Sequence, residues 1–508
     1  MRVRRCGETA LLIETEDVLG WYAALTARPL PGIVDLVPAV RTVLVRHESD
    51  FEVMASRLSE VKPLPATEVR ADPVTIPARY DGEDLTDVAK ATGMSEDEVV
   101  TVHTGTEYTV AFTGFAPGFG YLTGLDERLR LPRRDTPRTR VPAGAVAVAG
   151  EFTGVYPRPS PGGWHLLGST TAPLWDPSRE PPALLRPGAK VRFEAVDSLS
   201  EPSSRATTSV TSGDIEVVHC GPMATVQDTG RPGYAALGVG RSGFADVPSA
   251  ALANRLVGNV AEAACLELSF GATLKFRKGT RVAVTGAICT MARDGRGEAM
   301  NAPFDVHPGQ TLVIGPASTG LRAYVAVRGG ISAPVTLGSR STDVLSGLGP
   351  DPLAPGMTVP IGNAYAGPPP AVEVAPVRAP SAEDLEVHVL PGPRDDWFTD
   401  LGALFSGRYE VTADSNRVGV RLSGPALRRS REGELPTEGM VAGAIQVPPS
   451  GEPIVFLADH PVTGGYPVIA VVRAADLPMI AQARPGQMVR FRRSGTPRRS
   501  AARSLPGT

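Results

Sequence analysis

The chain has 508 residues, a formal net charge of −3 and four cysteines that stand singly. This length suits about three or four domains of ~100–200 residues each, and the small net charge gives no general attraction to nucleic acid or to an anionic membrane. No apolar run is long enough to cross a bilayer, and no cysteine spacing predicts a zinc site or a disulfide framework, so we expect a cytoplasmic protein without a structural metal.

The N-terminal part combines strand and helix patterns. Residues 42–45 are a short apolar strand, and Phe51, Met54 and Leu58 recur at helical spacing. We therefore expect a small α/β domain over residues 1–75.

The second segment, residues 76–197, is expected to hold a β-barrel domain. It begins with a strand at 76–80 and a helix over 84–92, and the capping box from Ser95 to Glu98 starts a second helix. Alternating strands and tight turns fill the rest of the segment.

A repeat organises the chain. Three anchors, Gly144 to Val148, Pro161 to Trp164 and Arg186 to Phe193, return in the same order at 443–447, 463–466 and 484–491. Each unit opens on an alternating strand, turns at Gly-Gly before an aromatic residue, and closes on a Pro-Gly turn with another strand. One β unit therefore occurs at least twice.

The closing element alone appears once more at 307–314, which predicts a weaker third copy within a β-rich domain over 214–363. Inside that domain, Asp246 is expected to cap a helix that has Pro248 in its first turn. The strong second copy gives a last barrel over 383–493.

Composition separates these units. Residues 198–213 are rich in Ser and Thr and predict a linker, residues 364–382 form a stiffer Pro-rich linker, and residues 494–508 form a basic tail. A solvated tail explains that last segment better than a binding arm does.

Several common catalytic and binding motifs are missing from the sequence. None of the five lysines follows a glycine or lies between methionines, so the chain has neither a Walker P-loop nor a covalently biotinylated segment. Residues 238–243 match Gly-x-Gly-x-x-Gly, but they lack the alternating strands and helices that a dinucleotide fold requires.

Three stretches could carry chemistry. Residues 112–122 interleave four aromatics with three glycines, which can form either flat ligand walls or a tight core bend. Arg417 and Arg421 fall on one face of an expected strand, where their guanidiniums could bind a carboxylate or phosphate or simply face solvent. Asp459 stands beside His460 and a Gly-Gly turn whose amides could hold an anion, although an Asx turn explains Asp459 almost as well.

These motifs resemble a known family. Residues 103–176 resemble the first subunit of the kinase-inhibitor, allophanate-hydrolase-subunit and 5-oxoprolinase family. The resemblance rests on the aromatic-glycine stretch 112–122, on Arg138 and on the Pro-Gly-Gly-Trp turn. Residues 226–231, 242–246, 328–331, 337–342, 443–448 and 459–467 resemble its second subunit. The chain is thus similar to a fusion of the B and C subunits of 5-oxoprolinase, related to urea amidolyase. Two positions depart from the family pattern: Pro461-Val462 replace a frequent Gln-Thr, and Asn416 replaces a frequent Asp.

The resemblance implies a mainly β fold with α+β elements, built from repeated cyclophilin-like β-barrels and the small N-terminal domain. It also implies an ATP-dependent 5-oxoprolinase component that uses ATP with Mg²⁺ bound by the complex, acts on a small lactam or amide, and works with a separate lactam-utilisation subunit. A homo-oligomer is a further possibility. Two alternatives stay open: a urea carboxylase-like carboxyltransferase with a separate biotin carrier, and a non-enzymatic regulator that inhibits a histidine kinase.

On these motifs we expect Asp459 and Arg417 to be catalytic. Substrate or nucleotide is expected to bind at Phe115, Pro117, Gly118, Tyr121, Arg138, Gly162, Gly163, Trp164, Arg421, Gln446, Thr463, Gly464, Gly465 and Tyr466. No metal ligand is expected on this chain.

Overall fold

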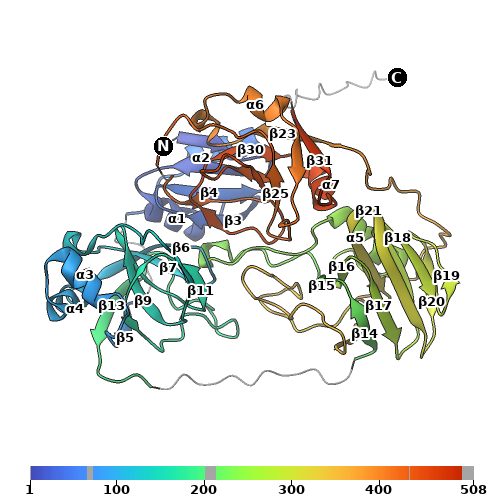
Figure 1. Ribbon diagram of the computed structural model, residues 1–508, viewed down its shortest axis with the longest axis horizontal. Helices are drawn as coiled ribbons and strands as arrows, with labels where there is room; N and C mark the ends of the chain where they lie inside the picture. The colour runs from blue at the N-terminus through green and yellow to red at the C-terminus, as the bar shows by residue number, and fades with distance from the viewer. Residues whose placement is uncertain (1, 66–71, 201–212, 434, 495–508) are drawn as a thin grey trace.

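The computed structural model describes residues 2–65, 72–200, 213–433 and 435–494. Strands hold 36% of the residues and helices 14%, which confirms the mainly β prediction. The N-terminal sheet and the last barrel lie together, and the first barrel and the middle domain flank them on either side (Figure 1). Most of the expected linker 198–213 and of the tail 494–508 falls outside the described residues.

The N-terminal domain is an antiparallel sheet in the order β1-β2-β4-β3. Its strands are β1 (Arg2–Arg5), β2 (Ala10–Glu14), β3 (Ile33–Pro38) and β4 (Thr42–His47), and its helices are α1 (Val18–Ala27) and α2 (Phe51–Ser59). Leu11 and Val45 pack with the helices, whereas Leu12 and Leu44 pack against the last barrel. Because both faces of the sheet are covered there, the inner strands carry continuous apolar runs, at residues 10–13 of β2 and 43–45 of β4, instead of alternating.

The first barrel is a seven-stranded sheet in the order β12-β9-β10-β7-β6-β13-β5. An isolated bridge between Arg79 and Ser169 joins its two outer strands. The strands are β5 (Val74–Ala78), β6 (Tyr108–Thr113), β7 (Gly120–Thr123), β9 (Ala145–Ala149), β10 (Phe152–Val155), β12 (His165–Ser169) and β13 (Lys190–Ala195). Helices α3 (Leu85–Thr92) and α4 (Glu96–Thr104) lie between the first two barrel strands, β5 and β6, and the predicted capping box of Ser95 and Glu98 is present.

The last barrel is closed in the order β23-β30-β27-β28-β25-β24-β31. Its strands are β23 (Leu385–Pro391), β24 (Tyr409–Val411), β25 (Gly419–Ser423), β27 (Ala444–Gln446), β28 (Ile454–Phe456), β30 (Val468–Val472) and β31 (Met488–Arg493), with short helices α6 (Gly402–Ser406) and α7 (Leu477–Ala481).

The two barrels have the same topology. When the strands of each barrel are taken in chain order, corresponding strands occupy the same positions in the two sheets. Each barrel also has one parallel pair, β5 with β13 and β23 with β31. The three sequence anchors fall on equivalent elements, for example on β9 and β27. Each barrel also carries a two-stranded ribbon, β8 (Arg138–Val141) with β11 (Ser160–Gly162) and β26 (Glu438–Gly439) with β29 (Thr463–Gly464). The predicted duplication is therefore confirmed.

The middle domain is not a third copy, and that prediction is wrong. Its nine-stranded sheet is antiparallel and includes the two long strands β18 (Thr280–Arg293) and β21 (Thr311–Val327). The remaining strands are β14 (Ile215–Cys220), β15 (Met223–Gln227), β16 (Cys265–Ser269), β17 (Ala272–Phe276), β19 (Arg296–Gly297), β20 (Pro303–Val306) and β22 (Thr358–Val359). The turn at 307–310 does lead into β21, but a Pro-Gly turn encodes only a local reversal of the chain. As predicted, Asp246 caps α5 (Val247–Leu256).

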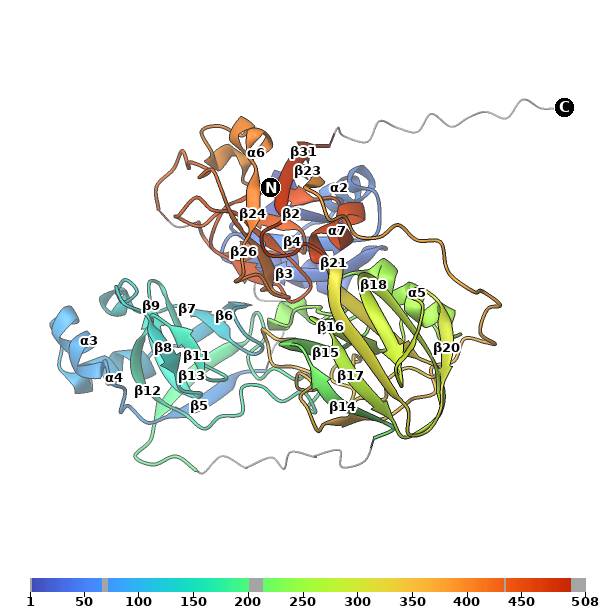
Figure 2. The same ribbon diagram turned by 45° about the vertical axis from the view of Figure 1, so that its right-hand side comes forward.

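A loop of the middle domain connects it with both preceding units. The Thr113 hydroxyl donates to the Ala236 carbonyl at 2.6 Å, and the Asp35 carboxylate accepts from the Gly233 amide at 3.1 Å. Turning the molecule shows the same loop region between the lobes (Figure 2). Residues distant in sequence therefore meet where the domains join.

Candidate functional site

The Gly-Gly-aromatic elements of the two barrels meet at one cleft. A cavity of about 330 Å³ is lined by Phe115, Phe119, Tyr121, Arg133, Arg134, Pro137, Tyr156, Pro161, Gly162, Gly163, Trp164 and Tyr466. All but Tyr466 come from the first barrel domain. Tyr466 occupies in the last barrel the repeat position that Trp164 occupies in the first, so the duplicated element supplies both walls.

The walls are packed aromatic rings. The Phe119 ring stands edge-on to Trp164 at 5.4 Å and to Tyr156 at 5.2 Å between centroids, and Tyr121 meets Trp164 at 5.6 Å. Phe115 is 41% exposed and has a φ of 64°, a left-handed backbone that is uncommon for a bulky residue. Such clusters present flat apolar faces in a fixed geometry.

Glycine permits close approach within this cluster. A Cβ at Gly162 would lie 2.3 Å from the Tyr156 hydroxyl oxygen, so any larger residue would displace that ring. Similarly, a Cβ at Gly114 would lie 2.2 Å from the Thr463 hydroxyl oxygen, where the bend packs against the last barrel. The glycines of both predicted stretches thus serve close packing between rings and between barrels.

Hydroxyl groups and arginines give the cleft its polarity. Burial raises the pKa of Tyr121 and of Tyr156 to about 12, against the opposing effect of Arg133. Both tyrosines are therefore neutral near pH 7 and can donate hydrogen bonds. The cleft combines aromatic faces, hydroxyl donors and guanidiniums.

Asp84 holds two arginines at the edge of the cleft. It accepts from Arg134 at 2.5 Å and from Arg138 at 2.8 and 2.9 Å. Burial alone would raise the pKa of Asp84, but the hydrogen bonds from Arg138 and from the Leu166 amide bring it below its usual value. Arg138 therefore contacts Asp84 and is not among the residues lining the cleft.

A second groove continues from the first. It measures about 640 Å³ and shares Tyr121, Arg133 and Trp164 with the smaller cleft. Its other walls include Val40 and Arg41 from the N-terminal domain, and residues 435–437 from the last barrel. Three units of the chain therefore border one continuous aromatic surface.

Other expected binding residues lie beneath or away from this surface. The Gln446 amide donates to the Tyr466 carbonyl at 3.1 Å, and a Cβ at Gly464 would lie 2.7 Å from that amide nitrogen. Gly465 faces the Leu435 carbonyl, and Thr463 is buried against Gly114. These residues support the Tyr466 side of the cleft.

Pro117 and Gly118 are buried where the middle domain docks. The Gly118 amide donates to the Leu237 carbonyl at 3.1 Å. Arg421 is exposed on β25, outside the residues lining the cleft.

Arg417 and Asp459, the two residues expected to be catalytic, do not line the cleft. Both are buried, at 0% and 1% exposure, between the last barrel and the middle domain. Arg417 donates twice to Asp459, at 2.9 Å each, and also to Glu267 and to the Gly243 carbonyl. Asp459 accepts further from the Ser242 hydroxyl at 2.6 Å and from the Val344 amide at 3.1 Å.

This network keeps the Arg417 guanidinium charged. Burial alone would lower the pKa of Arg417, but Asp459 and Glu267 raise it. Each guanidinium nitrogen of Arg417 has an acceptor, and a buried ion pair that has its hydrogen bonds satisfied can hold two surfaces in register. Arg417 and Asp459 thus lie at the domain junction, away from the residues lining the cleft, and their catalytic role stays a prediction.

The expected site residues left out six that line the cleft, namely Phe119, Arg133, Arg134, Pro137, Tyr156 and Pro161. Phe119 lies inside the aromatic-glycine stretch 112–122, and Arg133 and Arg134 stand just before Pro137 and Arg138, so the sequence motifs already pointed to these three residues. No sequence motif pointed to Tyr156, since only the fold brings it to the Gly162 turn.

No group of three or more His, Cys, Asp or Glu side chains suited to a metal occurs among the described residues. The same part of the chain has no helix long and apolar enough to cross a membrane.

Comparison with known proteins agrees with this architecture. Residues 237–493 match the family described as carboxyltransferase domain, subdomain A and B, and residues 1–185 match carboxyltransferase domain, subdomain C and D. The chain is 35% identical over 287 residues to the C subunit of 5-oxoprolinase from Escherichia coli (strain K12), covering 54% of this chain and 90% of that protein. It is 41% identical over 210 residues to the B subunit of 5-oxoprolinase from Escherichia coli O157:H7, covering 38% of this chain and 96% of that protein.

One solved structure matches nearly the full length. The crystal structure of TTHA0988 in space group P212121 aligns with a TM-score of 0.85 and 36% identity, covering 97% of this chain and 100% of that one. Both sets of subdomains thus occur together in a known fold. The chain belongs to the carboxyltransferase-domain family, as a fusion of regions similar to the B and C subunits of 5-oxoprolinase.

Proposed function

We propose that this chain is the fused B and C component of an ATP-dependent 5-oxoprolinase that opens 5-oxoproline, or a closely similar lactam, to the amino acid. The observation that carries the proposal is the aromatic cleft to which both barrels contribute, Trp164 from one and Tyr466 from the other. The similarity to both named subunits supports it. A cytoplasmic location suits its four free cysteines.

A small planar lactam with a carboxylate matches the chemistry of the cleft. Its ring would lie against the aromatic faces, and its carboxylate would pair with Arg133, which also borders the larger groove. The Tyr121 and Tyr156 hydroxyls, neutral near pH 7, would donate to the amide oxygen. These groups bind and orient the substrate while the rings exclude water.

ATP with Mg²⁺ is assigned to the complex with a separate lactam-utilisation subunit. The described residues lining the small cleft include two arginines but no lysine and no carboxylate, a set that fits a carboxylate better than a metal-bound triphosphate. In the complex, ATP would supply the phosphoryl group that activates the amide oxygen. The relatives are themselves named as subunits, which supports the need for a partner.

The test is reconstitution. The full chain is purified, combined with the candidate partner subunit, and assayed for phosphate release that depends on 5-oxoproline. Release that needs both proteins and both substrates supports the proposal. Turnover by the partner alone at the same rate would remove this chain from the reaction.

A carboxyltransferase acting with a separate biotin carrier is the second candidate, favoured by the description of both matching families. Avidin discriminates the two activities because it sequesters biotin. Avidin should leave the 5-oxoproline-dependent phosphate release unchanged, and inhibition in a fully purified system would favour carboxyl transfer.

A further inference from the structure

One wall of the aromatic cleft is joined to the middle domain by a single side chain. The segment 156–164 supplies five of the residues that line the cleft. Within it, Arg158 donates through both terminal nitrogens of its guanidinium, to the carbonyls of Ser346 and Leu345. In the part of the chain that the structure describes, every hydrogen bond from this segment to another domain comes from Arg158.

The loop that receives Arg158, residues 343–348, leaves its carbonyls open to the guanidinium. The Asp343 carboxylate accepts from the amides of the same two residues, at 2.9 and 3.0 Å, so their N–H groups are already bonded within the loop. Gly347 then turns the chain with a φ of 68°, and a Cβ there would lie 3.0 Å from Arg158 Nη1. The loop therefore approaches the guanidinium closely.

The same loop contacts the segment that carries the opposite wall. The Val344 amide donates to Asp459 at 3.1 Å, and Asp459 lies shortly before Tyr466, which lines the cleft from the last barrel. Val344 directly precedes Leu345, so one short loop touches the supports of both walls. The separation of the two walls, and hence the width of the cleft, depends on loop 343–348.

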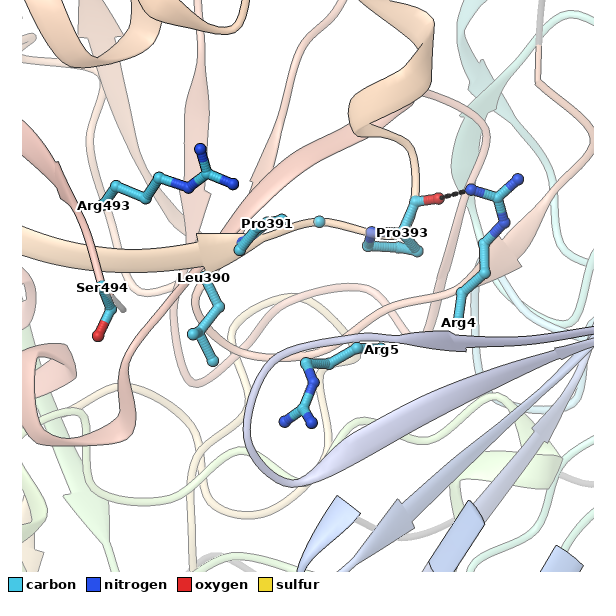
Figure 3. A pocket seen from close by; sticks show the side chains of 8 residues that line it. Arg4, Arg5, Leu390, Pro391, Pro393, Arg493 and Ser494 are labelled. Atoms are coloured by element: carbon cyan, nitrogen blue, oxygen red, sulfur yellow. Dashed lines mark hydrogen bonds between the residues drawn. The ribbon is translucent and has the colours of Figure 1, made fainter. Parts of the chain in front are cut away.

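The last barrel is also fixed to the N-terminal sheet, independently of this loop. Arg4 Nη1 donates to the Pro393 carbonyl at 3.0 Å across that seam (Figure 3). An apolar face of the sheet packs against the same barrel. Loss of Arg158 should therefore leave the Tyr466 wall in place and release the wall that belongs to the first barrel.

We propose that Arg158 is a positioning residue for the aromatic cleft: it holds the 156–164 wall against loop 343–348 and so sets the distance from that wall to Tyr466. The inference rests on the proposed function, because it takes the cleft as the lactam site. It gives the middle domain a part in substrate binding, although none of the described residues of that domain lines the cleft.

Kinetics of the full chain, reconstituted with its partner, test this role. Arg158→Gln should raise the KM for 5-oxoproline about tenfold, because a small misplacement of a binding wall is costly. The kcat should change less than about threefold, since the wall binds the ground state and the transition state alike. Loss of a merely structural contact would instead lower kcat with the folded fraction and leave the KM unchanged.

Two further variants control this measurement. Arg158→Lys keeps a positive charge and N–H donors, so it should recover most of the affinity. Arg140→Gln is the matched control, since Arg140 is exposed on β8 of the same ribbon, and it should leave both constants unchanged.

Hydrogen exchange separates this inference from the proposed function. In the full chain without partner or substrate, Arg158→Gln should speed amide exchange in the 156–164 wall and in loop 343–348, and Arg140→Gln should not. Faster exchange together with a raised KM supports the positioning role. Unchanged exchange, an unchanged KM in the active complex, or equal effects of Arg140→Gln would overturn it. If the wild type releases no phosphate with 5-oxoproline, the proposed function fails, and the exchange alone decides whether Arg158 holds the wall.

Discussion

Arg417 and Asp459 form a two-pronged ion pair, with Nε–Oδ2 and Nη2–Oδ1 distances of 2.9 Å, and both are sealed between the last barrel and the middle domain. Removing one partner of such a pair leaves an uncompensated buried charge.

The loss of this pair should therefore appear as instability. We expect Arg417→Met and Asp459→Asn each to destabilise the fold by ~3–5 kcal/mol, with activity falling in proportion to the folded fraction. Thermal and denaturant unfolding measure the effect. Arg421→Met is the matched control, because Arg421 is exposed on β25 and exposed substitutions usually stay within about ±0.5 kcal/mol. A hundredfold loss of turnover at unchanged stability would return the pair to a catalytic role.

The aromatic cleft predicts a different outcome. Trp164→Ala and Tyr466→Ala should each lower 5-oxoproline-dependent phosphate release at least tenfold, because each removes one wall of the cleft. The readout is the KM for 5-oxoproline as well as the rate. Phe270→Ala is the control, since Phe270 is 51% exposed on the middle domain. Equal effects of all three substitutions would show that the cleft has no special role.

The two halves should remain associated when the chain is divided. Residues 1–200 and 214–508 contact each other through Thr113 with Ala236, Asp35 with Gly233, and the face of the N-terminal sheet that packs on the last barrel. A covalent linker then only raises the effective concentration of one half near the other. Co-expressed halves should elute together on gel filtration at micromolar concentration. Separate elution would contradict this interface.

Buried His103 should make the first barrel sensitive to acid. Its ring contacts the Tyr80 hydroxyl at 2.7 Å and the Thr153 hydroxyl at 2.8 Å, and burial lowers its pKa to about 3. Between pH ~6.5, where an unfolded histidine titrates, and about 3, the unfolded chain binds a proton that the folded chain does not. Stability therefore decreases as the pH falls, by up to ~1.4 kcal/mol per pH unit.

Urea unfolding at pH 6.5 to 4.5 measures this dependence. His103→Gln should flatten the slope, whereas His219→Gln, at an exposed position, should leave it unchanged. Identical slopes in wild type and His103→Gln would show that His103 does not carry the effect.

The sequence by itself determined the duplicated barrels. The Gly-Gly-aromatic turn and the Pro-Gly turn before β13 and β31 are local signals, because backbone torsions and alternation act between near neighbours in the chain. For the same reason the caps of α4 and α5 could be predicted from Ser95 and Asp246. The local turn at 307–310 carries no information on strand pairing, which is why the prediction of a third copy of the barrel was wrong.

Only the tertiary structure decided which polar residues meet solvent. Alternation places Arg417 and Arg421 on one face of a strand, yet the first is fully buried and the second exposed. The difference arises because β25 begins only at Gly419, and Arg417, just before it, is covered by Glu267 and Gly243 from another domain. Likewise Tyr466 joins Trp164 in one cleft only because two barrels pack together. A strand's own periodicity fixes its faces, whereas the element that covers each face is set by packing between units far apart in the chain.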